Sequence, residues 1–381
     1  MLFEFGLRNF FSFREGATIS FRLDSKCPEE VSLGRGYTPV ICVKGANASG
    51  KTQLLKGLAF LATFCADSFE LDPDDGIPII PFYDSSEPSE FFAEFMIEDV
   101  AYRYEAAMTE TEVIREVLYR TKQRQVKVFE REGNTITYAN KLSIGLKSIN
   151  LRKNASIIST ARQYKLPVEE LGQIYTFFKM VTSNVTFSGL REEPRDIPFV
   201  SKFLHGNPEV FKFVKDFIKE CDTGISDIDI IEVVDPDRET RYAPVFTHEH
   251  NGKAHPIIAM VESSGTKALY RDLATYHLAL KYGSIVIADE LDINLHPYLL
   301  SKIVDLFVDE ETNPNGAQLI FSSHNTEIMD QLGRYRTYLV NKDENESFAY
   351  RLDDVPGDIL RNDRAISPAY RDGKIGGVPR L

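Results

Sequence analysis

The sequence has 381 residues, of which 43% are hydrophobic, so a large buried core is expected. Its formal net charge of −13 argues against a surface that is basic throughout, although a local basic patch for nucleic acid stays open. The four cysteines include no C-x-x-C pair, so neither a disulfide framework nor a cysteine zinc site is expected, and a reducing cytoplasm fits. No apolar run approaches the roughly 20 residues that span a bilayer, and the N-terminus lacks the pattern of a signal peptide.

The first part of the chain predicts strands around one helix. Alternating apolar residues predict strands and strand pairs at 2–13, 17–23, 91–108 and 112–129. A short apolar run at 40–43 predicts a buried strand, and the helical spacing of residues 53–61 predicts a helix soon after it. Gly133-Asn134 predicts a further hairpin turn.

The middle of the chain changes character near residue 150. Helical periodicity predicts helices at 155–164, 168–180 and 208–220, and therefore a helical subdomain over about 150–222. Residues 225–234 return to a strand pattern. A strand pair over 242–258 is expected to turn at Asn251-Gly252.

The last third alternates helices with short apolar strands. Helices are expected at 264–282 and 297–307, and strands at 284–288, 318–322 and 338–341. Such alternation is typical of a parallel sheet covered on both faces, so the predicted fold class is α/β.

A phosphate-binding loop follows the strand at 40–43. Residues 45–52, GANASGKT, fit the pattern G-x-x-x-x-G-K-[ST]. Gly45 and Gly50 allow the backbone to wrap a phosphate, with Asn47 and Ser49 inside the same loop. Lys51 adds a positive charge, and Thr52 offers a hydroxyl to Mg²⁺.

Two acids close the strand at 284–288. Asp289, at the carboxyl end of a buried strand, is placed to support Mg²⁺, and Glu290 beside it can polarise an attacking water. The alternative is a pair of solvated acids, which the nearby phosphate loop makes the weaker interpretation.

Two further groups stand where they could meet a phosphate. Ser264, Gly265 and Thr266 open a predicted helix and could bind an anion, although a simple helix cap by Ser263 or Ser264 would explain the same residues. His324 lies just past the strand at 318–322, where it could hydrogen-bond a γ-phosphate.

Three weaker patterns have competing explanations. His248, His250 and His255 could hold a metal, but a polar hairpin is the preferred interpretation. Residues 341–344, NKDE, nearly match the guanine-reading N-K-x-D motif, but Glu344 stands where Asp is needed, so ATP is preferred. A basic edge of the meander could contact nucleic acid or a partner, or could protect an exposed strand; its residues are Arg120, Lys122, Arg124, Lys127 and Arg131.

The four motifs together resemble those of ABC-type ATPases of the structural-maintenance-of-chromosomes (SMC) and recombination-repair class. They are the Walker A motif GANASGKT, the signature ESSGT, the Walker B segment IVIADE followed by LDINLHP, and the switch FSSH. The opening RNFFSF resembles the opening motif of the same class. The closing ISPAYRDGKIGGVP is similar to the tail of its stand-alone branch of anti-phage abortive-infection ATPases, which includes the RloA, AbiL, PARIS and OLD-like ATPases.

The resemblance implies a P-loop NTPase fold with a mixed sheet, an antiparallel β-subdomain and a helical insertion. It implies a nucleotide-binding domain formed by residues 1–90 and 255–381. It further implies a β-meander lobe at 91–149 and an insertion at 150–254, whose final hairpin leads to the signature.

The resemblance also assigns roles and cofactors. ATP and Mg²⁺ would be bound by Lys51 and Thr52, with Asp289 supporting the metal, Glu290 as catalytic base and His324 sensing the γ-phosphate. Ser264 to Thr266 would complete the nucleotide site of a second copy in a homodimer or higher homo-oligomer, and Asp292 would lie near the dimer seam. The glutamine that such ATPases carry between Walker A and the signature has no clear equivalent, and residues 81–86 are the expected place.

The implied function is a cytoplasmic ATPase that senses or regulates a separate effector, a toxin or a nuclease, in anti-phage defence. No coiled coil or zinc hook is expected, and too few residues follow His324 for a nuclease domain of the OLD type. The alternatives are a DNA repair or chromosome-structural ATPase, and a scaffold whose ATP turns over slowly.

Overall fold

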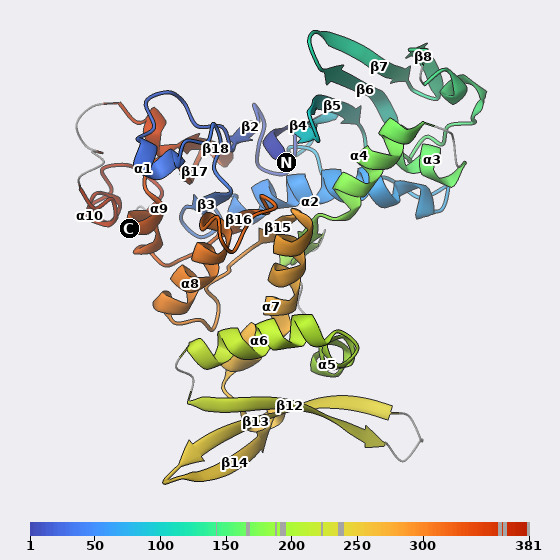
Figure 1. Cartoon of the computed structure of the whole chain (residues 1–381). Coiled ribbons are helices and arrows are strands. Elements are labelled where there is room, and N and C mark those ends of the chain that lie inside the picture. Colours follow the sequence, from blue (N-terminus) through green and yellow to red (C-terminus); the bar gives the residue numbers. More distant parts are fainter. Residues whose placement is uncertain are drawn as a thin grey trace.

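The computed structural model describes residues 1–141, 143–164, 168–186, 196–221, 224–234, 240–356, 360 and 364–378, with the backbone of 189–190. Helix α2 (Lys51–Asp67) runs through the middle of the molecule between two large sheets, and a smaller sheet forms an arm at one end (Figure 1). The predicted α/β class is confirmed, with one mixed and one antiparallel sheet.

The central sheet has six strands. In spatial order they are β18 (Glu346–Arg351), β17 (Thr337–Asp343), β3 (Val40–Lys44), β16 (Gln318–Ser322), β15 (Ile285–Ala288) and β9 (Thr182–Ser183). All neighbours are parallel except the edge pair of β17 and β18. The carboxyl ends of β3, β16, β15 and β9 therefore meet at one edge, which is where ligands bind in such sheets.

The central strands are apolar because both faces are covered. Along β3, Ile41 and Val43 join the core on the α2 side, whereas Val40 and Cys42 join the core on the opposite side. Helices α7 (Ser264–Tyr282) and α8 (Pro297–Val308) cover that second face. Sequences of this kind show no clean alternation, which is why short apolar runs marked these strands.

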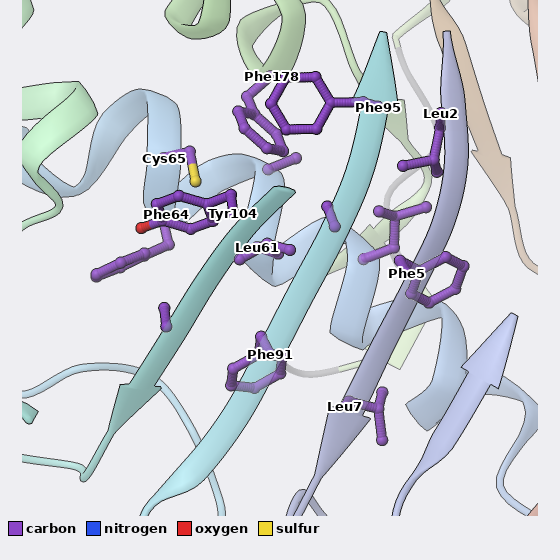
Figure 2. Packing of buried hydrophobic residues seen from close by; sticks show 14 of the residues in the cluster. Leu2, Phe5, Leu7, Leu61, Phe64, Cys65, Phe91, Phe95, Tyr104 and Phe178 are labelled. Atoms are coloured by element: carbon purple, nitrogen blue, oxygen red, sulfur yellow. The ribbon is translucent and has the colours of Figure 1, made fainter. Parts of the chain in front are cut away.

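The second sheet is antiparallel and has seven strands. Their order is β2 (Ala17–Ser20), β1 (Leu2–Arg8), β4 (Ser89–Ile97), β5 (Val100–Met108), β6 (Val113–Thr121), β7 (Gln125–Glu132) and β8 (Thr135–Ala139). This confirms the predicted N-terminal strand pair, meander and last hairpin. Figure 2 shows side chains of β1, β4 and β5, among them Phe5 and Phe95, on the face that meets Leu61 and Phe64 of α2.

Residues 150–254, which the sequence presents as one insertion, are divided between the two cores. Helices α3 (Ile157–Gln163) and α4 (Glu169–Lys179) pack with α2 and the seven-stranded sheet. Helices α5 (Ile197–His205) and α6 (Pro208–Glu220) pack with α7 instead. Between them the chain adds β9 to the central sheet and forms the small pair β10 (Val185–Thr186) and β11 (Gly189–Leu190).

The arm is a three-stranded antiparallel sheet next to α5 and α6 (Figure 1). Its strands are β12 (Ile225–Val234), β13 (Thr240–His250) and β14 (Lys253–Ile258), with the predicted turn at Asn251-Gly252. One face contributes Phe246, whose ring packs edge-on against Tyr270 of α7. The arm is therefore joined to the helix that carries the signature segment.

The remaining helices are short. They are α1 (Glu29–Ser32), α9 (Ile328–Leu332) and α10 (Ser367–Arg371). The C-terminal tail folds back on β17, where Asn341 accepts a hydrogen bond from Gly377 N at 2.6 Å and donates one to the Tyr350 hydroxyl at 3.0 Å. The amide that resembled a guanine-reading group thus anchors the tail. Of the helices that the structure describes, none combines the length and the apolar character that a bilayer crossing requires.

Candidate active site

The phosphate loop joins β3 to α2, so the amino end of α2 points at the loop. Gly50 has φ of 114°, and a Cβ atom there would lie 2.8 Å from the Ser347 hydroxyl, so only glycine fits. The Lys51 ammonium donates to the carbonyl oxygens of Gly45 and Ala46 at 3.0 and 2.9 Å. Burial lowers the pKa of Lys51. The lysine is thus already folded over the loop that a phosphate would enter.

The Ser49 hydroxyl indicates that the loop binds a polar ligand. Its side chain is buried, yet its hydroxyl has no hydrogen-bond partner among the described residues. A buried polar group without a partner is costly, and a phosphate oxygen is an acceptor that would satisfy it. Asn47, in contrast, is exposed at the mouth of the loop. The residues present therefore fit a nucleotide phosphate.

Asp289 is the centre of the site. Its side chain is buried, and one carboxylate oxygen accepts a hydrogen bond of 2.6 Å from the Thr52 hydroxyl. The other carboxylate oxygen accepts one of 2.5 Å from the Ser322 hydroxyl. The pair of a hydroxyl and a carboxylate from two motifs is the hard oxygen donor set that Mg²⁺ prefers, so these residues fit that metal.

Glu290 is held by its backbone, and its carboxylate lies partly exposed beside His324. Its φ is 51°, in the left-handed region that is uncommon outside glycine, and its N–H donates to the Ser322 hydroxyl at 2.8 Å. The side chain is about a third exposed, and one carboxylate oxygen lies 3.7 Å from Nε2 of His324. Ser322, a residue of the switch segment FSSH to which the sequence assigned no role, therefore fixes both acids at once.

Asn184 is a second residue that the sequence did not reveal. It follows β9 at the sheet edge, where its amide donates to the Asp289 carbonyl at 2.9 Å and accepts from the Asp289 N–H at 2.7 Å. Residues 81–86, the expected place for the glutamine that such ATPases carry, lie beside the N-terminal turn, where Phe82 N donates to the Asn9 side chain at 3.0 Å. Asn184 thus occupies the position beside Asp289.

We expect Asn184→Ala to lower ATP turnover about tenfold while ATP affinity changes little, because the backbone that aims Asp289 loses two hydrogen bonds. Those bonds should also cost about 1–3 kcal/mol of stability. Phosphate release, ATP titration and thermal melting measure the three quantities. Asn315→Ala is the matched control, because the Asn315 side chain also makes two hydrogen bonds to the backbone, here by donating to the carbonyls of Leu280 and Lys281 at the far end of α7. Equal turnover in the two variants would contradict this role.

In the signature segment, one serine caps helix α7 and the next serine is exposed. Ser263 is the N-cap of α7, and its hydroxyl accepts from Thr266 N at 3.0 Å. Thr266 is buried, whereas Ser264 is exposed. Gly265 packs closely on the loop after Walker B, since a Cβ atom there would lie 2.8 Å from the Asn294 carbonyl oxygen. The first turn of α7 is therefore fixed by its cap and leaves Ser264 facing outward.

The arm reaches the signature through His248. Its Nε2 lies 2.5 Å from one carboxylate oxygen of Glu262, and the other oxygen accepts from Ser263 N at 3.0 Å. Among the residues that the structure describes, no group of three metal-binding side chains occurs. His248 thus holds Glu262, the residue before the cap of α7.

Three of the five basic residues of the meander edge are paired with acids of the same chain, whereas Lys122 and Arg124 are exposed. Arg131 is fully buried and pairs with Glu116 at 3.3 Å. Arg120 lies 3.4 Å from Glu170, and Lys127 lies 2.5 Å from Glu130. These three paired side chains therefore stabilise the β-lobe.

The chain is similar to one family model and to several solved structures. A family model described as "AAA domain, putative AbiEii toxin, Type IV TA system" matches residues 40–330, and none of the curated proteins matches. Among solved structures, the SMC head domain from Thermotoga maritima is 14% identical, with 92% of this chain and 98% of that chain covered and a TM-score of 0.44. The SMC head domain with a coiled coil and joint derived from Pyrococcus yayanosii is 12% identical, with 97% and 99% covered and a TM-score of 0.48.

The family match covers the phosphate loop, both acids and the switch histidine, which the fold brings to one edge of the central sheet. The chain therefore belongs to the AAA-domain family that carries the AbiEii description, and it is an ATPase.

Proposed function

We propose that the protein binds ATP with Mg²⁺ and hydrolyses it at the edge formed by β3, β15 and β16. The observation that carries this proposal is the carboxylate of Asp289, shared between the hydroxyls of Thr52 and Ser322. It joins the phosphate loop, the Walker B strand and the switch strand at one point. The convergence of three motifs at the carboxyl edge of a parallel sheet is typical of a ligand site.

Each side chain has a separate task in this reaction. Lys51 and the N–H groups at the start of α2 hold the phosphates, and Ser49 donates its hydroxyl to one of their oxygens. Thr52 and Asp289 would hold Mg²⁺, whose positive charge offsets the charge that develops on the transferred phosphoryl group. Glu290 accepts the proton of the attacking water, and His324 donates a hydrogen bond to the γ-phosphate.

The outward-facing start of α7 supports a head-to-tail dimer. Ser264 and Gly265 present a rigid, capped helix N-terminus, which is an anion site. Glu262, two residues before Ser264, pairs with His248 of the arm, and Gly265 packs closely on the Asn294 carbonyl. A second copy that places its Ser264 to Thr266 over the phosphate loop would complete the ATP site, so that ATP closes the dimer and hydrolysis opens it.

The role that fits these features is control of a separate effector, a toxin or nuclease, in anti-phage defence. The family description names a toxin of a toxin–antitoxin system, which favours this setting. The net charge of −13 and the paired meander arginines count against direct nucleic-acid binding as the main activity. The arm, joined to the signature by His248, is the element suited to pass the nucleotide state to a partner.

Two inactive variants should restore each other if the site is shared between copies. We expect Ser264→Arg to bind ATP but not to dimerise or turn over, because the added side chain blocks the surface over the phosphates. Lys51→Ala should be inactive because its own phosphate loop no longer holds ATP, although its Ser264 surface is intact. Mixed together, they form one intact site per dimer, so up to about half of the turnover of a wild-type dimer should return.

The control for this mixing experiment is Tyr282→Arg, a change of similar size at the exposed far end of α7. It should keep wild-type turnover. Full activity of Ser264→Arg alone would rule out the shared site, and so would a mixture that stays inactive although the chains are shown to associate.

A further inference from the structure

A buried lysine with no part in the proposed reaction stands at the end of β3. Lys44 is 1% exposed, and its side chain lies on the same side of the strand as Cys42, away from α2. Lysines are almost never this buried unless their charge is met by partners. Burial lowers the pKa of Lys44, and the nearby carboxylate of Asp292 acts against that shift.

The hydrogen-bond partners of Lys44 are on the switch loop, the segment after β16 that carries His324. Its ammonium donates to the carbonyl oxygen of Ser323 at 2.7 Å and to that of Asn325 at 2.8 Å. These two carbonyls flank His324 on either side. Neither of these two hydrogen bonds is made to the phosphate loop, although Lys44 directly precedes that loop in sequence.

The same loop is held from its other side by Asp292. The Asp292 carboxylate accepts from His324 N at 3.0 and 3.1 Å and from Asn325 N at 3.0 Å. The backbone around His324 is therefore fixed by a cation at its carbonyls and an anion at its N–H groups. Its imidazole stays about half exposed, 3.7 Å from Glu290.

We propose that Lys44 is a positioning residue, which with Asp292 clamps the switch loop so that the His324 ring is aimed at the γ-phosphate. The inference rests on the proposed hydrolysis and adds to it a residue that no motif contains. Because the clamp acts on the switch loop and not on the phosphate loop, its loss should reduce turnover and leave ATP binding intact. Misplacing a catalytic group by about 1 Å costs on the order of 100-fold in rate.

The decisive comparison is Lys44→Met, which fills the same space without donating a hydrogen bond. We expect kcat to fall about 10- to 100-fold while the Kd for ATP changes less than about threefold. Lys44→Gln keeps a donor on a shorter side chain and should lie between Met and wild type. It also supplies the comparison if circular dichroism shows that the Met variant is unfolded. Cys42→Ala is the matched control, since it disturbs the same face of β3 without touching the loop, and it should keep its kcat.

A double-variant cycle with His324→Ala separates positioning from general damage. If Lys44 acts through His324, adding Lys44→Met to His324→Ala should lower kcat little further. Rate losses that multiply would overturn the proposal, and so would wild-type kcat in both Lys44 variants. Failure of the proposed function would look different, because the wild-type chain itself would then release no phosphate from ATP.

Discussion

Glu290→Gln should bind ATP as tightly as the wild type and hydrolyse it about 10²- to 10⁴-fold more slowly, because an amide cannot accept the proton of the attacking water. The substitution should not disturb the site, since the left-handed backbone and the bond to Ser322 involve only the main chain of Glu290. With hydrolysis blocked, the ATP-bound dimer should accumulate. Phosphate release measures the rate, and light scattering after gel filtration with and without ATP measures the assembly.

A fair control is Glu344→Gln, which changes an acid with a similar left-handed backbone (φ 45°) in the turn between β17 and β18. It should leave rate and assembly unchanged. A Glu290→Gln protein with full turnover would remove Glu290 from the chemistry. One that lost turnover without gaining a dimer would leave the ATPase site intact and count against the head-to-tail arrangement.

Lys51→Ala should weaken ATP binding about 100-fold, a cost of about 3 kcal/mol, because the only ammonium folded over the loop in the described structure is lost. Calorimetry or a fluorescent ATP analogue measures the affinity. Turnover and ATP-dependent assembly should disappear with it at ATP concentrations that saturate the wild type.

For this second prediction Lys212→Ala serves as the control, because Lys212 is an exposed lysine on α6 that pairs only with Asp216 in the described structure. Its affinity for ATP should match the wild type. Unchanged affinity in Lys51→Ala would mean that residues 45–52 are not the phosphate site. Lost ATP binding with retained assembly and activity would count against the scaffold alternative as well, because ATP would hold that assembly together.

Local chemistry made much of the fold predictable. The bounds of α7 follow from Ser263, which caps its first turn, and from Gly283, whose φ of 66° ends it. The strands β3, β15 and β16 follow from apolar runs that both faces of the sheet must bury. The phosphate loop and the pair of acids could be read directly because their spacing along the chain carries the chemistry.

Other elements had no local signal. β9 is only two residues long, so it has no period, and it exists because it pairs with β15. The helices of residues 150–222 were found in outline, but only packing divides them between the two cores. The sequence has no means of showing which apolar face meets which neighbour.

Within the site, too, some residues could be predicted from the sequence and others only from the tertiary structure. The sequence by itself determined the phosphate loop, Asp289, Glu290 and His324, because each belongs to a motif of fixed spacing. Only the tertiary structure brought Asn184 and Ser322 to Asp289, and Lys44 to the switch loop. These residues act through hydrogen bonds between segments distant along the chain, and such partners are decided by the pairing of strands rather than by any local pattern.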